Sequence, residues 1–292
     1  MAKWTGQSKG SLLGYKIFAF LIKKGGLLPA YFVLRFVALY YFLFSWKSNK
    51  AIFYYFRKRM AYNLWKSICS VYKSYYVFGQ TLIDRVVISM GMIKKFTYEF
   101  DGIDNVFEAL NSGSGGIFIS AHVGNFEISE YFFEDGHKDI IINVLTTDLE
   151  RENIKNYLES LSIQSKAKYF ALSNDLSHVF TMHEALSRNE FICVTGDRYI
   201  DGSKYFESQF LGEVARFPAG PFMIASKLRV PVIFVYVMKD SNSHYHLYGR
   251  RATVDPKNPK VLFYSYVENL TWLINKYPHQ WFNYFDFWNK EE

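Results

Sequence analysis

The sequence predicts an α/β fold in which a mixed, mostly parallel sheet is flanked by helices and preceded by a hydrophobic helical segment. Two observations predict this class. From residue 96 onward, short apolar runs alternate with helix-like segments, as in an α/β sheet. The runs at 117–121, 191–195 and 232–238 show no polar alternation, which is typical of strands buried on both faces. Between residues 12 and 44, by contrast, the chain is strongly apolar.

The remaining elements complete this pattern. We expect further strands at 96–100, 140–145, 167–172 and 244–248, the last of them at a sheet edge. We expect helices at 51–90, 105–110, 126–133, 150–161, 176–187 and 261–275. Residues 1–10 are small and polar and are expected to be loose. The chain is therefore divided into an N-terminal hydrophobic segment, 1–58, and an α/β domain, 59–292.

The N-terminal segment has the composition of a membrane-associating element. Residues 27–44 contain one charge, Arg35, and come close to the length that crosses a bilayer. Because Arg35 would be costly in lipid, we favour two short helices that lie in or dip into one leaflet over a true span. Basic residues on both sides fit an anchor at the cytoplasmic face. The alternative is a hydrophobic hairpin packed against the α/β domain.

Composition narrows the classes of partner. Half of the residues are hydrophobic, a fifth are aromatic, and the net charge is +7. Such a basic, aromatic surface suits anionic lipid headgroups or an acidic carrier protein. No arginine-rich tract or nucleic-acid motif is present, so we expect no nucleic acid partner. Cys69 and Cys193 are too few and too distant for a disulfide framework or a metal site.

The stretch from residue 115 to 127 carries the candidate site. His122 follows the predicted strand 117–121, and the loop Val123-Gly124-Asn125 leads into a segment that contains Glu127. This loop can fold Glu127 back over His122 at the carboxyl edge of the sheet, where open α/β sheets bind ligands. A carboxylate near a helix N-terminus is favoured in its ionised form and could fix the imidazole tautomer. The alternative is an ordinary surface or capping pair.

Two further positions offer charged side chains near this edge. Asp197 and Arg198 follow the buried strand 191–195, so they reach the edge that carries His122 if the two strands are parallel. Arg198 could bind a phosphate group, and Arg216 is a second candidate for the same role. The alternative for Asp197 and Arg198 is a turn that closes a strand.

Several blocks together resemble a known superfamily. His122-Val123-Gly124-Asn125-Phe126-Glu127 is similar to the His-x-x-x-x-Asp/Glu signature of the lysophospholipid acyltransferase superfamily, and most resembles its branch of late lipid A biosynthesis acyltransferases. That branch also has counterparts of the segments at 195–198, 217–222, 230–233 and 277–282, the last similar to its Pro-x-Gln-Trp motif. The likeness runs from about residue 10 to 288. A single His-x-x-x-x-Glu match is weak, whereas several blocks in the right order are strong.

The resemblance implies an acyltransferase of the bacterial inner membrane, acting at its cytoplasmic face. It implies transfer of a fatty acyl chain from acyl carrier protein or coenzyme A to a hydroxyl or amine of a lipid A precursor-like acceptor. His122 is then the general base and Glu127 orients it, while the N–H groups of Gly124 and Asn125 are candidate oxyanion donors. Asp197 is implied as an acid that supports the site. No Gly-x-Ser-x-Gly elbow is present, so we expect no acyl-enzyme, and we expect no cofactor.

Departures from the family patterns leave alternatives open. Glycerophosphate acyltransferases typically have Glu at the position of Ala219 and Asp at that of Glu127, which argues against glycerol 3-phosphate as acceptor. The tail has aromatic residues where the lipid A branch usually has basic ones, which favours an aminolipid or aryl-polyene-type acceptor as the alternative. A non-catalytic lipid-binding protein is the alternative from another class. His178, His183, His244 and His246 show no metal-ligand spacing, and we expect no metal.

Overall fold

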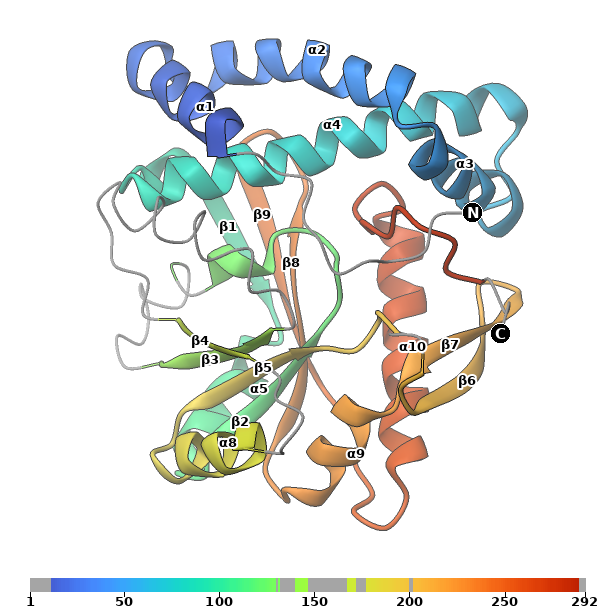
Figure 1. Ribbon diagram of the computed structural model, residues 1–292. Helices are drawn as coiled ribbons and strands as arrows, with labels where there is room; N and C mark the ends of the chain where they lie inside the picture. Colours follow the sequence, from blue (N-terminus) through green and yellow to red (C-terminus); the bar gives the residue numbers. More distant parts are fainter. Residues whose placement is uncertain are drawn as a thin grey trace.

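A seven-stranded sheet forms the centre of the molecule, as seen in the computed structural model (Figure 1). The structure describes residues 12–129, 131, 140–146, 167–171, 177–199 and 202–288. The strand order is β1-β9-β8-β2-β5-β3-β4. Their bounds are Thr97–Asp101 (β1), Gly116–Ser120 (β2), Ile142–Thr146 (β3), Lys168–Ala171 (β4), Phe191–Thr195 (β5), Val232–Lys239 (β8) and His244–Arg251 (β9).

The strand directions confirm a mixed, mostly parallel sheet. Strands β8, β2, β5, β3 and β4 are parallel neighbours, β9 is antiparallel to β8, and β1 is parallel to β9. All five residues of β2 are buried, as expected for an apolar strand between two others. The carboxyl ends of β2, β5 and β8 therefore meet at one edge, where doubly wound sheets bind ligands.

Helices cover both faces of this sheet. On one face, α10 (Pro259–Lys276) packs against Ile119 and Phe234, together with α9 (Gly220–Lys227). On the other face, α5 (Ile103–Asn111) packs against Phe118 and Val235. Helix α8 (Ser177–Ser187) follows β4 and returns the chain to β5. The alternating burial of Phe118 and Ile119 shows that the two sides of β2 enter different hydrophobic clusters.

The N-terminal helices are stacked mainly on the long helix α4 (Leu64–Ser89), and Tyr31 of α2 also reaches Lys239 at the end of β8 (Figure 1). Helix α2 (Leu27–Phe44) runs along α4 and buries Ala30, Tyr31, Leu34 and Ala38. Helix α1 (Leu12–Gly25) packs beside the start of α2 and the end of α4 (Figure 1). The opposite face of α2 is exposed and apolar. Two apolar helices are therefore present where the sequence predicts them, and α2 has the length and composition to cross a membrane.

Two regions differ from the predicted elements. The single helix expected at 51–90 is divided into α3 (Trp46–Tyr54), a π-helical turn (Tyr55–Arg59) and α4, because Ala61 adopts a positive φ of 54° and Asn63 caps α4. The hairpin β6–β7 (Tyr205–Phe210 and Glu213–Pro218) and helix α9 are not predicted. The predicted helix 150–161 lies outside the described residues, as does most of the predicted helix 126–133 beyond the 3₁₀ turn Phe126–Ile128.

Candidate active site

His122 lies at the carboxyl edge of the sheet, two residues beyond the end of β2. The neighbouring parallel strand β5 ends at Thr195, and the amide of Gly196 donates to the carbonyl of Ser120 (3.0 Å). This bond continues the β2–β5 ladder one step past the strands. It therefore brings Asp197, which follows β5, alongside His122, as the parallel arrangement predicts.

Asp197 holds His122 through both of its carboxylate oxygens. Oδ1 lies 2.7 Å from His122 Nδ1, and Oδ2 accepts the backbone N–H of His122 at 3.1 Å. The same Oδ2 accepts the indole N–H of Trp281 (3.3 Å) and the amide of Asn283 (3.1 Å). These four hydrogen bonds fix the position of the Asp197 carboxylate, and the carboxylate in turn fixes the orientation of the His122 ring.

The environment keeps Asp197 ionised. Its side chain is fully buried, and burial alone raises the pKa of a carboxyl group. The charge and hydrogen bonds of His122, together with the charge of Arg198, outweigh burial and lower the pKa of Asp197 to about 2. An ionised Asp197 accepts a hydrogen bond from the Nδ1–H group of His122. A neutral His122 therefore has its lone pair on Nε2, the nitrogen that can take a proton from a substrate.

The Gly124-Asn125 loop has a different role from the expected one. The N–H of Gly124 donates to the carbonyl of Gln280 (3.0 Å), and the N–H of Asn125 donates to the carbonyl of Val237 (2.8 Å). Since both donors are committed to the backbone, these amides hold the loop in place and do not point at an oxyanion. Gly124 has a φ of 52°, and a Cβ here would lie 2.0 Å from the carbonyl oxygen of Val237. Only glycine allows this close approach.

The side chain of Asn125 anchors the same loop from the other side. It is buried, and its amide donates to the carbonyl of Thr81 (3.0 Å) and lies 3.4 Å from the hydroxyl of Tyr245. The loop is thus fixed to α4 and β9. The side chain of Asn125 therefore holds the loop that follows His122.

The other predicted residues are placed as follows. Glu127 lies in the 3₁₀ turn Phe126–Ile128, but its side chain is outside the described part of the structure, so its expected contact with His122 stays a prediction. Arg198 donates to the side chain of Asn283 (2.9 Å) and the carbonyl of Phe282 (3.0 Å), so it holds the tail. Arg216 lies in the β6–β7 hairpin and forms an ion pair with Glu207 (3.1 Å).

The C-terminal tail supplies site residues that the sequence did not assign. The segment 280–282 runs antiparallel to 122–124, with a bridge between Val123 and Trp281 and a bond from the amide of Phe282 to the carbonyl of His122 (2.8 Å). The side chain of Gln280 is bonded to both the N–H and the carbonyl of Lys239, at 2.9 and 2.7 Å. The Pro-x-Gln-Trp resemblance marked this segment, but not its contact with Asp197.

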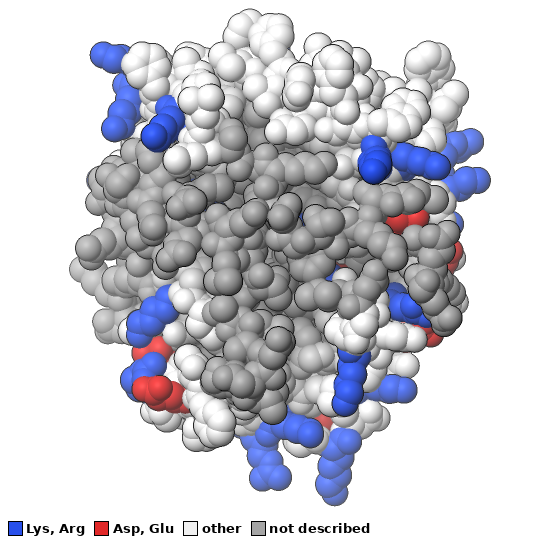
Figure 2. All heavy atoms as spheres, viewed as in Figure 1, with Lys and Arg blue, Asp and Glu red and all other residues white. Residues whose placement is uncertain are grey.

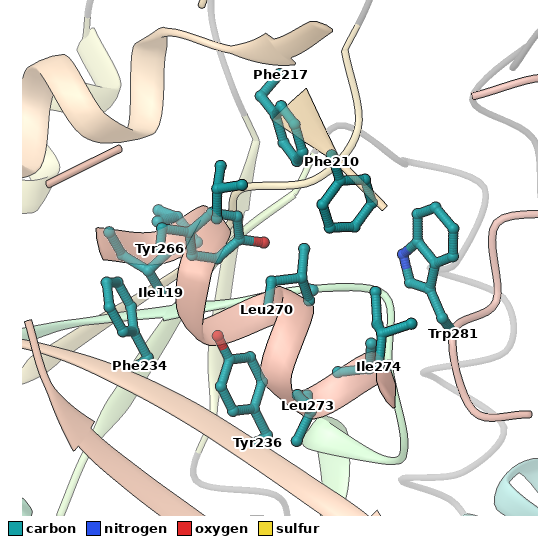
Figure 3. Packing of buried hydrophobic residues seen from close by; sticks show 14 of the residues in the cluster. Ile119, Phe210, Phe217, Phe234, Tyr236, Tyr266, Leu270, Leu273, Ile274 and Trp281 are labelled. Atoms are coloured by element: carbon teal, nitrogen blue, oxygen red, sulfur yellow. The ribbon is translucent and has the colours of Figure 1, made fainter. Parts of the chain in front are cut away.

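Aromatic packing holds the tail in this position. Trp281 is buried beside Phe210 and close to the α10 residues Leu270 and Ile274, as Figure 3 shows. Its ring also contacts Tyr55 of the π-helical turn at 5.2 Å between centroids. Most of the tail aromatics are therefore buried, namely Trp281, Phe282, Phe287 and Trp288, and their packing aims the indole N–H of Trp281 at Asp197.

Comparison with known families identifies the family in which this arrangement occurs. Residues 66–283 match the family model described as bacterial lipid A biosynthesis acyltransferase. The chain belongs to this family. The matched range contains His122, Asp197, the Gly124-Asn125 loop and the tail as far as Asn283. A comparison with individual curated proteins returned no match.

Membership makes the protein an acyltransferase that acts on a lipid. An acyltransferase of this kind uses an acyl donor and a lipid acceptor. The position of His122 and Asp197 within the matched range makes their pair the candidate centre for the transfer.

Proposed function

We propose that this acyltransferase moves a fatty acyl chain from acyl carrier protein or coenzyme A to a hydroxyl or amine of a lipid acceptor, with His122 as the general base. The observation that carries the proposal is the contact of 2.7 Å between His122 Nδ1 and the buried carboxylate of Asp197. It is the orientation that a catalytic triad gives its histidine, here without a serine or cysteine nucleophile assigned to the site.

The transfer proceeds directly between the two substrates. His122 Nε2 takes the proton of the acceptor hydroxyl as its oxygen attacks the thioester carbonyl carbon. The tetrahedral intermediate collapses with cleavage of the carbon–sulfur bond, and the imidazolium returns its proton to the departing thiolate. The products are an ester and a free thiol. Asp197 stabilises the imidazolium between the two proton transfers, and an amine acceptor uses the same steps to form an amide.

The acceptor that we favour is a lipid A precursor-like lipid, in keeping with the family. The alternative is an aminolipid or aryl-polyene-type acceptor. It is supported by the tail, in which Asn283 binds Asp197 and Arg198 rather than offering a positive charge to a phosphate. Arg198 is itself engaged by the tail through Phe282 and Asn283.

We further propose that the N-terminal helices place the enzyme on the cytoplasmic face of the bacterial inner membrane. The face of α2 opposite α4 exposes large apolar side chains: Leu28, Phe32, Phe36, Leu39, Tyr40, Leu43 and Phe44. Figure 2 shows this uncharged surface along the top of the molecule, with Lys and Arg side chains on both of its flanks. Apolar surface rimmed by basic residues fits a bilayer with anionic headgroups.

Lipid analysis of membranes that contain the protein tests the acyl transfer. Labelled acyl carrier protein and labelled acyl coenzyme A are supplied in separate arms with the lipids of the host, and products are identified by mass spectrometry. We expect a new acylated lipid with wild type and a loss of about 10²–10⁴-fold with His122→Ala, the usual range for a general base. His183→Ala, at an exposed position on α8, is the matched control. Equal product from His122→Ala and wild type would exclude His122 as the base.

A further inference from the structure

Four side chains outside the His122 site converge where β1, β9 and the end of β8 meet. His244 and His246 are two residues apart on β9, so they share one face of the sheet. Glu99 of β1 is the register partner of His246. Asp240 follows β8, and its amide donates to the carbonyl of His244 (3.0 Å). Three neighbouring chain segments thus deliver two imidazoles and two carboxylates to one place.

The distances within this group bring imidazole nitrogens close to carboxylate oxygens. His246 Nδ1 lies 2.7 Å from Glu99 Oε1 and 3.6 Å from Asp240 Oδ2, and His244 Nε2 lies 3.7 Å from Glu99 Oε1. The ligand atoms of Glu99, Asp240 and His244 all lie within 4.8 Å of one another. Donors around a tetrahedral zinc ion are separated by roughly 3.3 Å, given metal–ligand bonds of about 2 Å. Glu99, Asp240 and His244 therefore lie close enough together to share one ion, and His246 lies beside both carboxylates.

A hydroxyl group outside the shell prepares His244 for metal binding. Thr97 Oγ1 lies 2.7 Å from His244 Nδ1 and donates to the carbonyl of Ser243 at 3.4 Å. Because the hydroxyl donates its hydrogen bond to that carbonyl, its oxygen can accept a hydrogen bond from the Nδ1–H group of His244. Nε2 then carries a lone pair and faces a carboxylate oxygen, which is also an acceptor. Metal-binding histidines are commonly held in this way through their other nitrogen, and two facing acceptors favour a cation.

We propose that Glu99, Asp240, His244 and His246 bind one transition-metal dication of the Zn²⁺ class. Imidazole and carboxylate donors suit zinc, whereas Mg²⁺ prefers an octahedral shell of oxygens. Four protein ligands would leave no open position, so the ion has a structural role. Sequence spacing does not predict the site, because Glu99 joins it from a strand that is distant in the chain.

The ion would connect the edge of the sheet to the active-site tail. Burial, the hydrogen bond with Tyr248 and the nearby charge of Asp240 raise the pKa of Tyr277, three residues before Gln280. The positive charge of Lys276, which donates to the hydroxyl of Tyr248 (2.6 Å), also acts on Asp240, and the ion must compete with it. Binding should therefore stabilise the fold without taking part in acyl transfer.

Zinc binding by the purified full-length protein in detergent tests the site. The protein carries no histidine tag, is first treated with a chelator, and is titrated with ZnCl₂ by calorimetry, with metal content measured after dialysis. We expect one zinc ion per chain and a higher thermal midpoint, and no such rise with MgCl₂ at the same concentration. His244→Gln with His246→Gln should weaken binding by at least about 100-fold, and Thr97→Val by about 10–100-fold, the usual effect of losing an outer partner.

Three controls keep the result specific. Glu99→Gln tests the site at a position more than half exposed, where misfolding is not expected. His183→Gln and His122→Gln should both bind zinc like wild type, the second because the proposed site is separate from the catalytic pair. Circular dichroism verifies the fold of each variant. Wild type that binds no zinc, or zinc binding that is lost in His122→Gln and kept in the His244/His246 double variant, would overturn the proposal.

Discussion

At the scale of single residues, His122 is held by a carboxylate from a neighbouring strand. Glu127 is the partner that the sequence predicts for His122, because the two are close in the chain and a short loop can join them. The sequence also predicts Asp197 at the same edge of the sheet. It does not give the register between β2 and β5, and this register sets Asp197 beside His122 Nδ1. The fourfold hydrogen bonding of Asp197 depends equally on the tail, whose return to this edge is a property of the tertiary fold.

His279 gives a prediction for acid stability. Burial, followed by the charges of Lys73 and Lys66, lowers the pKa of His279 to about 4, against an ordinary value near 6.5. Between these values the unfolded chain binds a proton that the folded chain does not, so the folded state loses stability as the pH falls from about 6.5 to 4. Asp197, with a pKa of about 2, loses its own contribution only at lower pH.

The measurement is unfolding in mild detergent at pH 7 and pH 4.5 for wild type and His279→Gln. We expect the acid-induced loss of stability to be smaller in the variant by about 1–2 kcal/mol, after allowance for the partial exposure of the ring. The hydrogen bond between His279 and Ser70 is changed in the variant at both pH values, so it cancels in this comparison. An equal acid-induced loss in both proteins would show that His279 is not the group responsible.

At the scale of elements, a buried ionic cluster joins the N-terminal helices to the sheet. Asp84 of α4 lies 2.5 Å from the ammonium of Lys239 at the end of β8, and it accepts the hydroxyls of Tyr31 from α2 and Tyr245 from β9. Both charged side chains are almost fully buried. Burial raises the pKa of Asp84 and lowers that of Lys239, so each charge depends on the other.

Removing one partner of this pair should cost more than removing both charges. We expect Lys239→Met to reduce the free energy of unfolding by about 3 kcal/mol, because Asp84 is then buried without a counterion. Asp84→Asn combined with Lys239→Met should be less destabilised than the sum of the single variants by at least about 1 kcal/mol. Chemical denaturation followed by near-ultraviolet circular dichroism gives these values. Strictly additive losses would mean that the two charges do not stabilise each other.

The elements that sequence patterns predicted are those with one dominant signal. Strand β5 has the predicted bounds because a short apolar run between polar segments has few other interpretations. The β6–β7 hairpin was missed because its first strand alternates between partly buried and exposed residues. Its turn, Leu211-Gly212, takes positive φ at both residues, which only Gly212 signals in the sequence. The division of the helix expected at 51–90 was missed for a similar reason, because an alanine such as Ala61 gives no indication of a positive φ.

At the scale of the whole molecule, the enzyme presents an apolar surface on the side that carries α2. Because α2 already buries Tyr31 and Leu34 against α4, the helix lies along the protein and exposes its other face. This arrangement favours a helix that lies in the membrane interface over one that crosses the bilayer alone. The length and composition of α2 do not distinguish these two cases, and the interfacial position stays our proposal.

Charges placed on the exposed face should detach the enzyme from membranes. We expect Phe36→Glu with Leu43→Glu to move most of the protein to the soluble fraction, because both side chains are more than half exposed and lose their favourable burial in lipid. Phe180→Glu removes an aromatic residue of α8 that is even more exposed, and it should leave the distribution unchanged. Sedimentation with vesicles containing anionic lipid measures both. Full retention of the double variant on vesicles would show that this face does not bind the membrane.

We propose that acyl transfer depends on His122 held by an ionised Asp197. The most direct measurement is the steady-state turnover of Asp197→Asn with a labelled acyl donor and the acceptor identified from host lipids. Asp104→Asn, at an exposed position on α5, is the matched control. We predict that kcat falls by about 10²–10⁴-fold in Asp197→Asn with little change in KM for the donor, since Asn cannot stabilise an imidazolium. Turnover of a folded Asp197→Asn enzyme at the wild-type rate would contradict the account.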